Sequence, residues 1–168
     1  MAPLVVLVVV TVLLRVLGAL GVRALDWHAA LRGGLAAMFV LTGISHFVGM
    51  RPDLIAMVPP ALPHPALLVT VTGVLELAGA AGLLHRRLAP WAAGALGLLL
   101  VAMFPANVYA AMEGLTLGGS PAMDLVPRTL LQLLFLTGLG AVLRPYVRLP
   151  VTQERQGWQS TARRGYVP

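Results

Sequence analysis

The chain has 168 residues, of which 58% are hydrophobic and 11% are charged, whereas soluble domains average about 45–50% and about 25%. This composition excludes a sizeable soluble domain and predicts an all-α polytopic membrane protein. Cysteine is absent, which excludes disulfides, iron–sulfur clusters and thiolate metal sites. The net charge is +6, but most arginines flank apolar segments on one side, so we expect no nucleic-acid partner.

The first apolar segment, Pro3–Val22, is long enough to cross a bilayer core of roughly 30 Å. A cleaved signal peptide is the alternative, but such a peptide begins with basic residues, and Arg15 is the first basic side chain. We therefore expect residues 1–22 to form a retained N-terminal transmembrane helix. Arg15 lies inside this helix and is expected to extend toward the nearer interface.

The second apolar segment is Gly33–Val48, and a proline-rich stretch follows it. A short interfacial helix over residues 52–58 is expected within that stretch, because the later prolines exclude a longer helix. The third segment, Ala66–Leu84, is rich in small residues and carries a single carboxylate, Glu76. We expect this segment to be the central helix of the molecule.

The fourth and fifth apolar segments are Ala89–Met112 and Leu125–Leu143, joined by a Gly/Ser/Pro loop. Residues 31–143 are thus predicted to form a four-helix transmembrane bundle, to which the N-terminal helix is added. Residues 144–168 are predicted to be a cytoplasmic basic tail that is largely disordered. Five glycines are expected at close helix contacts: Gly73, Gly79, Gly82, Gly94 and Gly97.

The arginines predict the orientation in the membrane. If the spans alternate, the links after the first and third segments lie on the same side as the arginine-rich tail. The opposite side carries Arg51 together with the acids Asp53, Glu113 and Asp124. We therefore expect a multi-pass protein of the bacterial inner (cytoplasmic) membrane, with the N-terminus outside and the C-terminus in the cytoplasm.

With this orientation, polar side chains from four helices fall in the outer half of the bilayer: His46, Glu76, Asn107, Arg128 and Gln132. Ionisable groups inside a membrane usually face the bundle interior, so a shared polar cluster is expected. We expect an ion pair between Glu76 and Arg128. A purely structural role is the alternative, in which Asn107 satisfies backbone groups freed by Pro105 and Gln132 hydrogen-bonds between helices. No metal site and no catalytic residue is predicted. A metal site built from His46 and Glu76 is the least favoured of the functional alternatives.

Six short strings resemble the DoxX family of small bacterial membrane proteins: GISHF (43–47), MVPPALP (57–63), TGVLELAGAAGLL (72–84), RRLAPW (86–91), AMFPANVYAA (102–111) and PRTLLQLL (127–134). The resemblance implies a four-helix membrane bundle over residues 31–143. It also implies that the five polar residues occupy the family's recurring polar positions. The implied function is a redox-linked or quinone-associated component, whose polar cluster holds a quinone headgroup and which acts with a membrane redox partner.

Two other functions remain open from the sequence. In one, the helices bind or isomerise a lipophilic ligand, with Glu76 paired to a cationic or hydroxylated group. In the other, the protein is a non-catalytic structural or assembly subunit, or a homo-oligomer, and the polar cluster only specifies packing. No redox cofactor motif is evident, so a quinone is the one cofactor that we consider. The sequence does not decide whether the protein is an enzyme.

Overall fold

The structure is a computed structural model that describes residues 1–22 and 24–146. In this part of the chain it is all-helical apart from one small hairpin. The elements are α1 (Ala2–Ala19), α2 (Trp27–Ser45), α3 (Arg51–Ala56), α4 (Pro65–Leu84), α5 (Ala89–Met112), β1 (Thr116–Leu117), β2 (Ser120–Pro121) and α6 (Leu125–Leu143). Most of the predicted basic tail lies outside the described residues.

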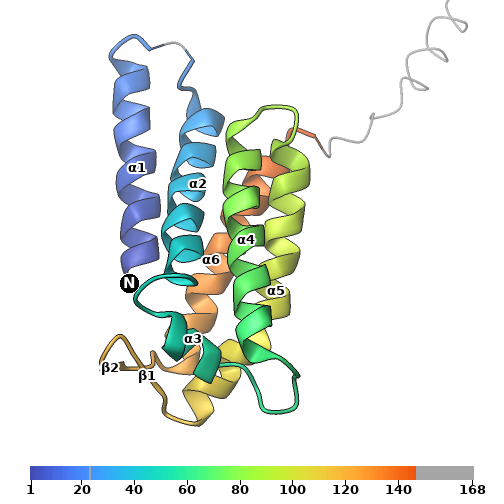
Figure 1. Ribbon diagram of the computed structural model, residues 1–168. Helices are drawn as coiled ribbons and strands as arrows, with labels where there is room; N and C mark the ends of the chain where they lie inside the picture. Colours follow the sequence, from blue (N-terminus) through green and yellow to red (C-terminus); the bar gives the residue numbers. More distant parts are fainter. Residues whose placement is uncertain (23, 147–168) are drawn as a thin grey trace, which may run out of the picture.

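The long helices lie side by side (Figure 1), and α3, the hairpin and the N-terminus share one end of the molecule. Helix α2 packs against α1, α4 and α6, while α5 packs against α4 and α6. The prediction that α4 is the central helix was therefore wrong, because α2 packs against three of the other long helices whereas α4 packs against α2 and α5. Small residues of α2 permit this: Gly34 lies against Thr11 of α1, and Gly43 lies against Leu77 of α4.

Five helices of the described chain, α1, α2, α4, α5 and α6, are long and apolar enough to cross a membrane. Their outward surfaces carry large apolar side chains. Trp91 is 80% exposed, Leu98 71% and Val5 56%. In water such surfaces would promote aggregation, whereas against lipid tails they are ordinary. The architecture is thus compatible with a multi-pass membrane protein.

The ends of the helices follow local chemistry. Helices α5 and α6 have the predicted bounds, but α2 begins well before Gly33, because Asp26 caps it by accepting a hydrogen bond from Ala29 N at 2.7 Å. The β1–β2 hairpin was not predicted. Gly118 and Gly119 both have positive φ at its turn, a conformation that glycine adopts without strain.

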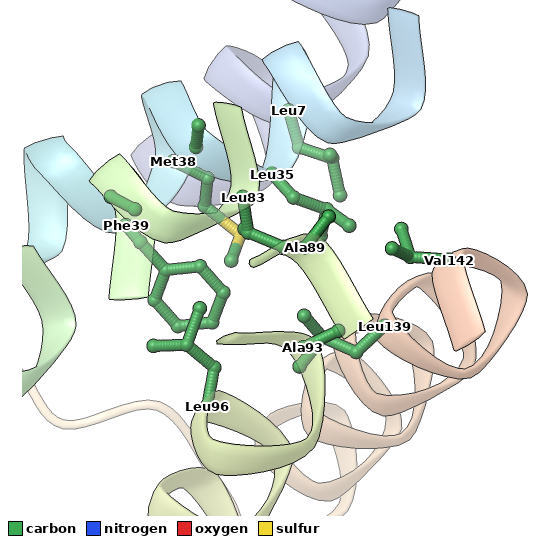
Figure 2. Packing of buried hydrophobic residues seen from close by; sticks show 12 residues of the cluster. Leu7, Leu35, Met38, Phe39, Leu83, Ala89, Ala93, Leu96, Leu139 and Val142 are labelled. Atoms are coloured by element: carbon green, nitrogen blue, oxygen red, sulfur yellow. The ribbon is translucent and has the colours of Figure 1, made fainter. Parts of the chain in front are cut away.

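The buried core is formed by side chains from all five long helices (Figure 2): Leu7, Leu35, Met38, Phe39, Leu83, Leu96, Leu139 and Val142. Lipid tails are as apolar as these residues, so close packing stabilises the helix contacts. A Cβ atom on Gly79 would lie 2.5 Å from Leu96 Cδ2, and one on Gly82 would lie 2.8 Å from Ala92 Cβ. Both predicted close contacts are confirmed.

Candidate functional site

Glu76 is buried in the contact between α4 and α2, with 3% of its surface exposed. The hydroxyl of Thr42 on α2 donates to Glu76 Oε2 at 2.5 Å. The same hydroxyl lies 3.3 Å from the backbone oxygen of Phe39, one turn earlier in α2. The hydrogen-bond partner of this buried carboxylate is therefore a hydroxyl of the neighbouring helix and not an arginine.

His46 follows directly after α2 and is also buried, with 4% of its surface exposed. Its Nδ1 lies 2.9 Å from Thr42 O, and because a carbonyl oxygen only accepts, Nδ1 carries the proton of this bond. Arg51 Nη1 donates to His46 O at 3.0 Å, and Arg51 Nη2 donates to Thr70 Oγ1 at 3.0 Å. Arg51 thus joins the carboxyl end of α2 to the first turns of α4.

Two glycines allow α2 and α4 to approach closely around this cluster. A Cβ atom on Gly73 would lie 2.5 Å from His46 Cβ, and one on Gly43 would lie 3.3 Å from Glu76 Cβ. No larger residue fits at Gly73 without displacing His46. Close helix approach therefore sets the short distance between Thr42 and Glu76.

A second polar group lies between α5 and α6. Arg128 Nη1 donates to Asn107 Oδ1 at 2.8 Å, and Gln132 Nε2 donates to Leu100 O at 3.1 Å. Pro105 has no N–H, so it leaves the backbone oxygen of Val101, four residues earlier in α5, without its helical donor. Gln132 bonds the adjacent backbone oxygen, that of Leu100, while Asn107 accepts from Arg128.

The structure therefore divides the five predicted site residues into two groups. His46 and Glu76 lie between α2 and α4, whereas the other three lie between α5 and α6. The expected ion pair of Glu76 with Arg128 was wrong, because α4 and α6 are not a principal packing pair and α5 contacts both. Residues 1–22 and 24–146 contain no group of three His, Cys, Asp or Glu side chains that could hold a metal ion.

Sequence reasoning missed two members of the α2–α4 group. Thr42 precedes His46 by four residues, so both lie on one face of α2, and this spacing was the available signal for Thr42. Arg51 comes shortly after the carboxyl end of α2, where a cation is favoured by the helix dipole. Its reach to Thr70 depends on the packing of α4 and has no signal in the sequence.

The apolar cavity with the largest volume among those described lies elsewhere. It is an open groove of about 640 Å³ lined by residues of α1 and α6, together with Trp27 and Leu31 from the first turns of α2. Its lining is almost entirely apolar and includes Leu7, Val8, Val12, Leu31, Leu134 and Ala141. Arg15 and Trp27 lie at one end, where Arg15 Nη1 donates to Leu25 O at 3.2 Å. Ligand sites typically measure about 300–1,000 Å³, so the groove has the size of a ligand site.

The polar clusters and the groove are distinct places in the molecule. None of His46, Glu76, Asn107, Arg128 and Gln132 lines the groove. The α2–α4 cluster is closed by the packing of the two helices, whereas the groove is open to the surroundings. Of the two places, only the groove has room for a molecule of appreciable size.

Comparisons with known proteins place the chain in a family. No curated protein and no solved structure matches it. The family described as Domain of unknown function (DUF8561) matches residues 35–138, well over half of the chain. The resemblance to DoxX was therefore wrong. Its motifs consist largely of Leu, Ala, Gly and Val, which membrane helices of many families share. The chain belongs to the family Domain of unknown function (DUF8561).

Proposed function

We propose that the protein is a multi-pass protein of the bacterial cytoplasmic membrane and binds a lipophilic ligand in the groove between α1 and α6. In this proposal α2, α4, α5 and α6 form a four-helix transmembrane bundle, and α1 is an additional N-terminal span. The N-terminus lies outside and the C-terminus in the cytoplasm, which the arginine asymmetry supports. The observation that carries the ligand is the groove itself, with its volume of about 640 Å³ and its apolar lining.

The shape and lining of the groove indicate the form of the ligand. Apolar residues follow α1 from Leu4 to Ala19, so the groove accommodates an elongated hydrocarbon or isoprenoid chain. The polar end of the ligand lies beside Arg15 and Trp27. Arg15 uses Nη1 to bond Leu25 O, and a guanidinium has five N–H donors, so other donors are available to a ligand.

The α2–α4 cluster supports a structural role instead of a binding role. Thr42 donates to Oε2 of Glu76, the side chain of Glu76 is almost fully buried, and Gly43 lies close against its Cβ. An interhelical hydrogen bond inside a membrane fixes the register of the two helices, since a lateral shift would leave the carboxylate without a donor. Glu76 is thus proposed to specify how α2 and α4 pack.

The quinone-linked redox hypothesis rested on the DoxX resemblance and loses that support. A quinone with an isoprenoid tail is one of the lipophiles that the groove could accept by size, and identification of the ligand decides between it and other lipids. A quinone that co-purifies in stoichiometric amount would return the redox hypothesis to consideration.

Co-purification with a matched pair of variants tests the proposal. Val12 lines the groove and Val5 does not, yet both lie on α1 and are similarly exposed, at 54% and 56%. The protein is purified in mild detergent and bound lipophiles are identified by native mass spectrometry. Wild type and Val5→Trp should carry a lipophilic ligand, and Val12→Trp should lose it because the indole fills the groove. Equal occupancy in both variants, or no ligand on wild type, would contradict the proposal.

A further inference from the structure

Two smaller polar cavities lie near the Trp27 end of the groove. The first measures about 550 Å³ and is lined by Trp27, His28, Ala141, Arg144 and Pro145. It shares Trp27 and Ala141 with the apolar groove. The second measures about 230 Å³ and shares His28 and Pro145 with the first. The apolar groove and the polar cavities are therefore neighbours at the same end of the molecule.

The polar region has an excess of positive charge. Arg32 and Arg86 line the second cavity and Arg144 lines the first, whereas Asp26 is the one acidic residue among the described residues that line them. The carboxylate of Asp26 is engaged at the amino end of α2, where its Oδ1 accepts from Ala29 N. Arg32 of α2 and Arg86 of the turn between α4 and α5 share the second cavity, whereas Arg144, directly after α6, lines the neighbouring first cavity.

One of these arginines has an unused donor. Arg32 Nε is buried and has no hydrogen-bond partner among the described residues. Buried polar groups in proteins are normally hydrogen-bonded, so this N–H is unusual in having no acceptor in the described chain. Because Nε itself is closed off from the cavity that Arg32 lines, a ligand there would meet the other N–H donors of the guanidinium. A guanidinium is well matched to the oxygens of a phosphate, which it can bind through two donors at once.

We propose that the ligand of the groove is an anionic phospholipid whose phosphate headgroup lies among Arg32, Arg86 and Arg144. This inference rests on the proposed function, since the acyl chain of the lipid occupies the groove. The headgroup then lies at the end of the molecule assigned to the cytoplasm, where the membrane leaflet is rich in anionic lipids. A zwitterionic lipid with the same chains would fill the groove but would leave the positive charge only partly balanced.

The test compares two lipids with identical chains. Dioleoyl phosphatidylglycerol, dioleoyl phosphatidylcholine and inorganic phosphate are titrated separately onto the full chain in detergent, and bound ligand is measured by native mass spectrometry. Wild type should bind the glycerol lipid about tenfold more tightly than the choline lipid, the equivalent of one charge-assisted hydrogen bond. Arg32→Gln should lose this preference, and so should Arg86→Gln, which changes an exposed residue of the same cavity. Arg87→Gln, adjacent in the same turn but outside the cavity lining, should keep it.

The outcomes separate this inference from the proposed function. Equal affinity of wild type for both lipids, or equal effects of Arg86→Gln and Arg87→Gln, would overturn the headgroup site and leave the groove intact. If inorganic phosphate binds as tightly as the glycerol lipid, the arginines form a site for free phosphate, and the proposal that they bind a lipid headgroup is wrong. Val12→Trp should weaken the binding of both lipids alike. If it weakens the binding of neither lipid while the preference for the glycerol lipid persists, the proposed binding in the groove is wrong and only the headgroup site is supported.

Discussion

Glu76 and Arg128 each bond a neutral side chain on an adjacent helix, and not one another. That each needs a partner follows from sequence alone, because an unsatisfied polar group in hydrocarbon costs several kcal/mol. The identity of the partner does not follow, because it depends on which helices are adjacent. Thr42 and Asn107 supply the bonds because α2 packs on α4 and α5 packs on α6.

The hydroxyl of Thr42 can be tested by a near-isosteric change. Thr42→Val keeps the shape of the side chain but removes the donor to Glu76, so the free energy of unfolding should fall by about 1–3 kcal/mol. Thr42→Ser retains the hydroxyl and should lose much less. Thermal unfolding in a single detergent measures both, and equal losses would show that the bond does not stabilise the fold.

A double-mutant cycle distinguishes the two polar groups from a single shared site. Glu76→Gln and Arg128→Met should have additive effects on the free energy of unfolding, within about 0.5 kcal/mol, because the residues share no partner. Asn107→Leu and Arg128→Met should instead be coupled, since each removes the same bond. A strong coupling between Glu76 and Arg128 would restore the ion pair that the sequence predicted.

At the scale of whole elements, the sequence predicted the existence of the long helices well and their arrangement poorly. Polar links separate the apolar segments and mark where the helices end, so the bounds of α5 and α6 were predicted correctly. The exposed faces of α4 and α5 are about as apolar as their buried faces, as expected of helices that face lipid instead of water. The pattern therefore does not indicate which face meets which neighbour, and for this reason the central place of α2 was missed.

Glycines on these helices differ in the space around them, which yields a matched comparison. A Cβ atom at Gly73 would lie 2.5 Å from His46 Cβ, whereas at Gly94 nothing lies within 4 Å. The prediction that Gly94 makes a close helix contact was accordingly wrong. Gly73→Ala should therefore destabilise the protein by about 1–3 kcal/mol through overpacking. Gly94→Ala should be neutral or stabilise it by up to about 1 kcal/mol, and thermal unfolding that ranks the two variants in the reverse order would contradict the packing of α2 on α4.

At the scale of the whole molecule, the helices place the α3 and β1–β2 segments at one end and the α4–α5 turn at the other (Figure 1). In the orientation that we propose from the arginine asymmetry, the first end lies outside. Cysteines introduced at Ser120 in β2 and at His85 after α4 should therefore respond oppositely to a membrane-impermeant thiol reagent. In intact cells Ser120→Cys should be labelled and His85→Cys protected; protection of Ser120→Cys with labelling of His85→Cys would reverse the topology.

The candidate site shows what one sequence can and cannot give. Composition and segment lengths predicted a membrane protein with several helices, and the five helices long enough to span a membrane agree with that. The groove was not predicted, because its walls come from α1 and α6, which lie more than 100 residues apart in the chain. The sequence of each wall is that of an ordinary lipid-facing helix surface. The cavity forms only because α1 and α6 both pack against α2.

Binding of a lipophile in the groove between α1 and α6 is the central claim, and an experimental structure determined in lipid tests it most directly. We expect elongated density along Val8, Val12 and Leu134 that continues past Arg15 toward Trp27. This density should be missing from Val12→Trp and present in Val5→Trp. Direct packing of α1 on α6 with no density between them would contradict the central claim.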